Sequence, residues 1–87
     1  MDSSDTEPRV LLLTRPGCHL CEAARDTVAA VAGRLGVAWA ERRIDGDPEL
    51  LARHSEEVPV LLVDGIVRDF WVIDPRRLEG LLTAPQA

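Results

Sequence analysis

The spacing of apolar positions changes once near the start of the chain, which predicts a strand followed by a helix. Residues 10–13 form a continuous apolar run, typical of a strand buried on both faces, and turn residues at 14–17 end it. A second set of apolar residues recurs at steps of three and four, which predicts one buried helix face over about 19–35. These residues are Leu20, Ala24, Val28, Val31 and Leu35. Gly36 suits the end of this helix.

The middle of the chain predicts a less protected strand and a short helix. The apolar residues Ala38, Ala40 and Ile44 alternate with polar or exposed residues around Trp39, as expected for a strand at a sheet edge. Asp47 and Pro48 then combine a capping side chain with a proline suited to a first helical turn. We therefore expect a helix over about 48–55.

The last third of the chain predicts a hairpin and a final helix. Apolar runs at 60–63 and 66–71 surround the dipeptide Asp-Gly at 64–65, the strongest short-range signal for a β-hairpin. Asp-Pro at 74–75 repeats the pattern of a helix start. The apolar face of this helix consists of Leu78, Leu81 and Leu82.

The order of elements, β-α-β-α-β-β-α, predicts an α/β fold. A helical crossover makes the first two strands parallel, and the tight turn makes the last two antiparallel. We expect one mixed four-stranded sheet with helices on both faces and the first and third strands at its centre. With 87 residues, the chain is expected to form a single domain over 9–83, between tails at 1–8 and 84–87.

Composition and charge narrow the classes of partner. The chain has 15 acidic residues against 10 basic ones, all arginine, and a net charge of −5. This balance argues against nucleic acid or an anionic membrane as the main partner. No apolar stretch reaches the length of a membrane span, and residues 1–8 are acidic and polar. We expect a cytoplasmic monomer.

Cys18 and Cys21 are the only cysteines, and they lie between the first strand and the first helix. A structural disulfide there would close a loop of only four residues and stabilise by roughly 2 kcal/mol. A zinc site needs four ligands, and beyond the cysteines the chain offers only His19 and His54 plus carboxylates. We therefore expect no metal site within one chain, although a metal or iron–sulfur cluster shared between two chains stays an alternative.

A reactive dithiol explains the position of the two cysteines as well as their spacing. At the helix N-terminus, unpaired N–H groups and the positive dipole end favour a Cys18 thiolate, so its pKa should lie below the free value of about 8.5. Cys21 lies one turn further on and points inward, close enough to attack a mixed disulfide at Cys18. Cys18 is the expected nucleophile and Cys21 the resolving thiol.

Other residues of interest flank this pair, each with a plainer alternative. Arg15 is expected either to add positive potential or meet an acidic group on a substrate, or to be a solvated turn residue. His19 either donates to the Cys18 sulfur and tunes its reduction potential, or is an exposed residue without a role. A cis bond before Pro59 would turn the Val58 backbone toward the cysteines to pair with an extended substrate; an ordinary trans proline is the alternative.

The segments T-R-P-G-C-H-L-C and E-V-P-V-L-L-V-D-G, and the distance between them, resemble the small glutaredoxin-like proteins of the thioredoxin fold. The resemblance spans about 9–83. It implies thiol–disulfide exchange with Cys18 as nucleophile, Cys21 as resolving thiol and a cis Pro59. Arg15 lies where typical glutaredoxins have a lysine.

Two departures bear on the cofactor. Typical glutaredoxins have a tyrosine between the cysteines and a threonine before V-P, where this chain has His19-Leu20 and Glu57. They also have a Gly-Gly pair where this chain has Asp69-Phe70. The bulky Phe70 and the added negative charge of Glu57 and Asp69 disfavour the binding of glutathione, which is an anionic tripeptide. We expect no tightly bound cofactor, and these departures argue against strong binding of glutathione.

The sequence therefore predicts a dithiol oxidoreductase that reduces protein or small-molecule disulfides and is reset by an outside thiol reductant or reductase. The alternative is a non-enzymatic adaptor that senses redox state, or binds a metal or iron–sulfur cluster, through the same cysteines. Trp71, near the end of the last expected strand, belongs either to a partner surface or to the core under the last helix.

Overall fold

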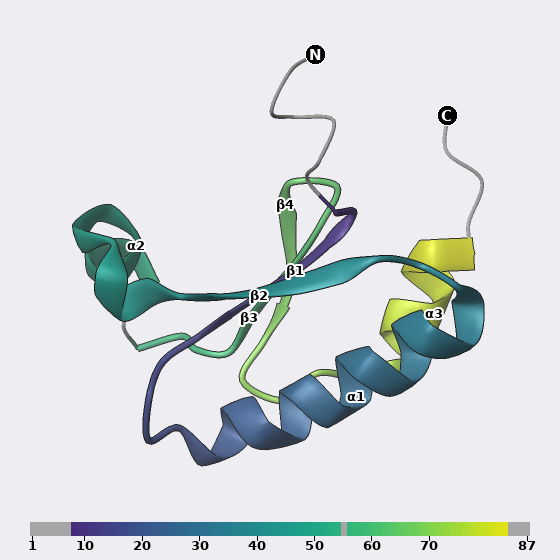
Figure 1. Ribbon diagram of the computed structural model, residues 1–87, viewed down its shortest axis with the longest axis horizontal. Coiled ribbons are helices and arrows are strands. Elements are labelled where there is room, and N and C mark those ends of the chain that lie inside the picture. The colour runs from purple at the N-terminus through teal and green to yellow at the C-terminus, as the bar shows by residue number, and fades with distance from the viewer. Residues whose placement is uncertain (1–7, 55, 84–87) are drawn as a thin grey trace.

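The computed structural model describes residues 8–54 and 56–83 (Figure 1). Their order confirms the expected β-α-β-α-β-β-α, with one turn of 3₁₀ helix added at Ile44–Gly46. The elements are β1 (Val10–Thr14), α1 (His19–Leu35), β2 (Trp39–Arg43), α2 (Pro48–His54), β3 (Val60–Val63), β4 (Ile66–Phe70) and α3 (Pro75–Thr83). Residue 55, the expected end of the second helix, residues 1–7 of the expected tail at 1–8, and the expected tail at 84–87 lie outside the described residues.

The four strands form one mixed sheet in the order β2-β1-β3-β4. β1 pairs parallel with β2 and antiparallel with β3, and β3 pairs antiparallel with β4. The expectations that β1 and β3 are central, and that β2 is an edge strand, are confirmed. Because β1 is central, the loop that follows Thr14 starts from the middle of the sheet and not from its border.

Helices cover both faces of the sheet, as predicted. α1 and α3 lie together, and α2 lies apart from them (Figure 1). The α1–α3 side holds the larger core, formed by residues of β1, β3 and both helices. These include Val10, Leu12, Ala24, Val28, Val31, Leu61, Val63, Ile73, Leu78 and Leu82. Leu50 of α2 packs instead against a second cluster, which contains Leu13, Val60 and Cys21.

The buried face of α1 begins at Cys21, and the expectation that Leu20 belongs to it is wrong. Cys21 is 1% exposed, whereas Leu20 is 43% exposed. Neighbouring residues of a helix differ by about 100° around its axis, so the two side chains cannot both face the sheet. α1 ends as predicted, at a left-handed Gly36 with φ of 69°. No helix in the stretches 8–54 and 56–83 is long and apolar enough to cross a membrane.

The hairpin between β3 and β4 has the expected turn but a shorter second strand. Asp64 and Gly65 both have positive φ, of 54° and 82°, as a type I′ turn requires. β4 ends at Phe70, so the expected extension to residue 71 is wrong. Trp71 lies outside the strand with φ of 65° and is 52% exposed, so of the two alternatives given for it, the one in the core under α3 is wrong.

Candidate functional site

The first turn of α1 is capped by a cysteine. Gly17, with φ of 74°, lets the chain turn after β1, and Cys18 follows in an extended conformation with φ of −98° and ψ of 111°. From this N-cap position Cys18 Sγ accepts a hydrogen bond from the Cys21 N–H at 3.1 Å. The predicted position of Cys18 at the helix N-terminus is confirmed. Its sulfur meets one of the four N–H groups that lack a partner within the helix.

The two cysteines form a disulfide, so the structure shows the oxidised pair. Their Cα atoms are 5.2 Å apart, within the ordinary range for a disulfide. Cys18 is partly exposed, whereas Cys21 is almost fully buried. Cys18 is therefore the more accessible residue of the pair and Cys21 the protected one, as the sequence predicted.

The Val58-Pro59 segment lies beside the cysteines. Its peptide bond is cis, as the resemblance implied. Buried Val58 belongs to the same apolar cluster as Cys21 and Leu13, and Cys18 packs against that cluster. Residues some 40 positions apart in the sequence thus meet at the carboxyl end of β1.

Arg15 and His19 both lie at this end of the sheet and are exposed. Arg15 is in the loop between β1 and α1, and His19 is the first residue of α1, directly after the N-cap. Both residues therefore lie on the surface close to Cys18 in the sequence. Their roles in binding and in tuning the sulfur stay predictions.

A polar cluster that the sequence did not indicate ties the cysteine helix to the sheet. The buried Thr14 hydroxyl donates to Glu41 Oε2 at 2.6 Å. Arg25, one turn beyond Cys21, donates from Nε and Nη2 to the two oxygens of the same carboxylate, both at 2.7 Å. The hydrogen bonds from Arg25 are the main reason that the pKa of Glu41 lies below its ordinary value. One carboxylate on β2 thus holds the end of β1 and the second turn of α1.

His54 pairs with a neighbour near the proline segment. It is buried, and its Nδ1 lies 3.1 Å from Glu57 Oε1, while the Glu57 N–H donates to the His54 carbonyl oxygen at 2.9 Å. These contacts shape the turn between α2 and β3. Among the residues that the structure describes, no three His, Cys, Asp or Glu side chains gather closely enough to hold a metal ion.

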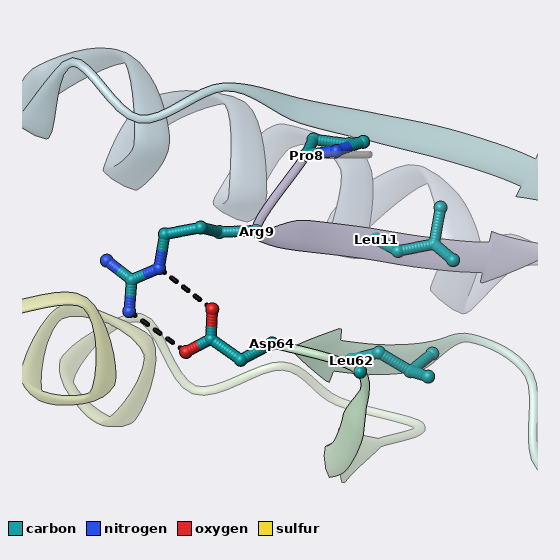
Figure 2. A pocket seen from close by; sticks show the side chains of 6 residues that line it. Pro8, Arg9, Leu11, Leu62 and Asp64 are labelled. Carbon is teal, nitrogen blue, oxygen red and sulfur yellow. Dashed lines mark hydrogen bonds and ion pairs between the residues drawn. The ribbon is translucent and has the colours of Figure 1, made fainter. Parts of the chain in front are cut away.

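A pocket of about 330 Å³ lies at the other end of β1 (Figure 2). Its charged lining residues, Arg9 and Asp64, bind each other through two hydrogen bonds of 3.0 and 3.1 Å. Leu11 and Leu62, cross-strand partners in the sheet, line it as well. The pocket reaches along β1 as far as Leu11, so three strand residues, or roughly 10 Å, separate it from the loop that leads to Cys18. The pocket is therefore not part of the cysteine site.

Comparison with known proteins agrees with this geometry. The model of the glutaredoxin-like domain (DUF836) family matches residues 9–83. An uncharacterized protein of Mycobacterium tuberculosis is 33% identical over 80 residues, 86% of this chain and 82% of that protein. The X-ray structure of a structural genomics target protein from X. campestris matches with a TM-score of 0.71 and 31% identity, covering 87% of this chain and 99% of that one.

The same fold occurs in a more distant structure. The X-ray structure of Fasciola hepatica thioredoxin covers 92% of this chain and 84% of its own, with a TM-score of 0.62 and 23% identity. This likeness shows a thioredoxin-like fold. Because the family match spans all seven main elements and the fold is thioredoxin-like, the chain belongs to the glutaredoxin-like domain (DUF836) family.

Proposed function

We propose that the protein is a thiol–disulfide oxidoreductase in which Cys18 is the nucleophile and Cys21 the resolving thiol. The observation that carries this proposal is the hydrogen bond from the Cys21 N–H to Cys18 Sγ at the N-terminus of α1. When the pair is reduced, the same N–H and the positive helix end stabilise a negative charge on that sulfur. A thiolate, and not a thiol, is the species that attacks a disulfide.

The reaction follows from the two different environments of the sulfurs. The Cys18 thiolate attacks one sulfur of the substrate disulfide, a mixed disulfide forms, and the other substrate sulfur leaves as a thiolate that takes up a proton. Cys21 then gives up its proton and attacks Cys18 Sγ. The second substrate thiol is released, and the Cys18–Cys21 disulfide of the structure is restored. The substrate gains two electrons and the protein loses two.

The remaining site residues bind the substrate and surround the Cys18 sulfur. The Val58 backbone, held beside the cysteines by its side-chain packing, pairs with an extended substrate, and buried Pro59 keeps that segment in place. Arg15 and His19 add polar contacts around Cys18. An outside thiol reductant or reductase returns two electrons to the protein, and the net charge of −5 disfavours strong binding of anionic glutathione.

A turnover assay tests the proposal. The protein is mixed with the small disulfide bis(2-hydroxyethyl) disulfide and excess dithiothreitol, and the catalysed rate is measured above the uncatalysed one. Cys18→Ser should abolish turnover, while Cys21→Ser, first reduced and then mixed with the disulfide after the dithiothreitol is removed, should accumulate a mixed disulfide on Cys18 that mass spectrometry detects. A Cys18→Ser protein as active as the parent would refute the proposal.

A further inference from the structure

Trp71 is held in a backbone conformation that its residue type disfavours. Its φ of 65° lies in the left-handed region, which costs free energy for a bulky side chain. Two hydrogen bonds maintain this conformation. The Trp71 N–H donates to the Pro59 carbonyl oxygen at 2.9 Å, and its indole Nε1–H donates to the Glu56 carbonyl oxygen at 3.1 Å.

The turn that carries Trp71 is also fixed from the side of β4. Asp69 accepts hydrogen bonds from the Phe70 N–H at 3.0 Å and from the Asp74 N–H at 3.2 Å, so one carboxylate spans the connection from β4 to α3. The Phe70 and Trp71 rings meet edge to face with centroids 4.9 Å apart. The aromatic pair is therefore built into a defined geometry.

This geometry exposes the rings instead of burying them. Trp71 is 52% exposed, and Phe70 and Val72 on either side of it are exposed as well. Burial normally offsets the cost of an unfavourable aromatic conformation, and at Trp71 about half of that gain is absent. Consecutive exposed apolar side chains in a strained turn are typical of a binding surface.

The aromatic surface lies next to the cysteine site. Pro59, which accepts the Trp71 N–H, directly follows Val58, and Val58 packs in the cluster that contains Cys21. A substrate strand lying along the Val58 backbone would therefore place neighbouring side chains near the indole.

The charge around the surface favours a basic partner. Segments 56–59 and 69–74, which carry the aromatic pair and the carbonyl groups that hold Trp71, contain four acidic residues, and the nearest basic residues in the sequence, Arg68, Arg76 and Arg77, lie just outside them, which leaves the region acidic. Glu56 is exposed next to the carbonyl that holds the indole. Negative charge beside exposed aromatic rings is complementary to a segment with a large apolar side chain next to lysine or arginine.

We propose that Phe70, Trp71 and Val72 form a docking surface for an extended segment of a protein substrate. The segment carries a bulky apolar side chain and a basic residue close to its reactive cysteine. This inference rests on the proposed function, because it takes the docked segment to be a substrate. It names a protein disulfide as the substrate class, in preference to small anionic disulfides.

A binding experiment without sulfur chemistry tests the surface. The probe is a synthetic peptide with phenylalanine and lysine beside a serine that replaces the reactive cysteine, titrated calorimetrically into the full-length oxidised protein. Trp71→Gly removes the indole ring and places there a residue that adopts the positive φ without strain. It should weaken binding of the peptide about tenfold. Ile66→Ala is the control, since Ile66 is 54% exposed on β4 near the hairpin, and should leave binding unchanged.

Changes in the peptide provide the second test, which needs no variant protein. Replacing its phenylalanine by alanine, or its lysine by glutamate, should weaken binding to the parent by a similar factor. The docking surface is refuted if the parent does not bind the probe, or if Trp71→Gly and Ile66→Ala bind it equally well. A parent that binds the peptide but does not turn over a disulfide would instead refute the proposed function.

Discussion

Cys18 Sγ accepts the backbone N–H of Cys21 across the first turn of α1, at 3.1 Å. The acceptor is the N-cap residue, so the sulfur occupies the place that a serine or aspartate oxygen takes in other helices. The donor is the N–H of Cys21, a residue that is almost fully buried. One hydrogen bond thus links the proposed nucleophile to the proposed resolving residue.

The two thiols of the reduced protein should differ in their rate of alkylation. Cys18 is partly exposed at the helix end, while Cys21 is 1% exposed. With limiting iodoacetamide near neutral pH, label should reach Cys18 at least about tenfold faster than Cys21, as peptide mass spectrometry can measure. Cys18→Ser is the control, and its remaining thiol should react slowly. Equal labelling of both cysteines in the parent would contradict the assigned roles.

The Glu41 carboxylate should make stability depend on pH. Hydrogen bonds from Arg25 are the first cause that lowers its pKa below the ordinary 4.5, and its side chain is only 27% exposed. A lowered folded-state pKa stabilises the fold above the unfolded-state value, and this contribution is lost as pH falls through the folded-state value. Between about pH 6 and about pH 3, the urea midpoint of Glu41→Gln should therefore fall less than that of the parent.

A surface ion pair provides the control for Glu41. Asp45 pairs with Arg43 at 2.7 Å, but both side chains are well exposed and neither bonds a buried hydroxyl. Asp45→Asn should therefore change the pH profile less than Glu41→Gln does. Parallel profiles for the parent and Glu41→Gln would show that the carboxylate does not anchor α1.

Two glycines of the cysteine helix should respond to alanine in opposite directions. Gly36 has φ of 69°, so Gly36→Ala should destabilise by about 1–2 kcal/mol. Gly33 lies within α1, where an added Cβ meets nothing within 4 Å, so Gly33→Ala should stabilise by up to about 1 kcal/mol. Urea denaturation measures both. A Gly36→Ala protein as stable as the parent would contradict the left-handed end of α1.

Leu12 and Leu20 should differ in their contribution to stability. Leu12 is fully buried in β1, so Leu12→Ala should lower the free energy of unfolding by about 2–5 kcal/mol. Leu20 projects from the first turn of α1, and Leu20→Ala should cost less than about 1 kcal/mol. Chemical denaturation of the two variants distinguishes them. A similar loss in both would place Leu20 back in the core, where its spacing alone had put it.

Besides the arrangement of the strands, which follows from the order of the elements, the features that the sequence predicted are set by neighbouring residues. The turn at Asp64-Gly65 follows from φ values that few residue types adopt, and the end of α1 follows from Gly36. The position of Cys18 at a helix start follows from the change in apolar spacing on either side of it. In each case a short segment carries enough information to specify its own conformation.

The features that the sequence did not predict depend on contacts between distant segments. Glu41 lies on an edge strand whose polar residues suggest a solvated surface, yet it binds Thr14 and Arg25, 27 and 16 positions away. No glycine or asparagine indicates a left-handed residue at Trp71; carbonyl groups of Glu56 and Pro59 hold it there. Such bonds become visible only when the strands and helices have been placed together.

Titration of the Cys18 thiol in the reduced Cys21→Ser variant tests the central claim most directly. The thiolate absorbs near 240 nm, and Cys18→Ser/Cys21→Ser provides the baseline. The helix N-terminus should hold the pKa of Cys18 clearly below the free value of about 8.5, so that a substantial fraction is ionised at neutral pH. A thiol that ionises like free cysteine would contradict the account.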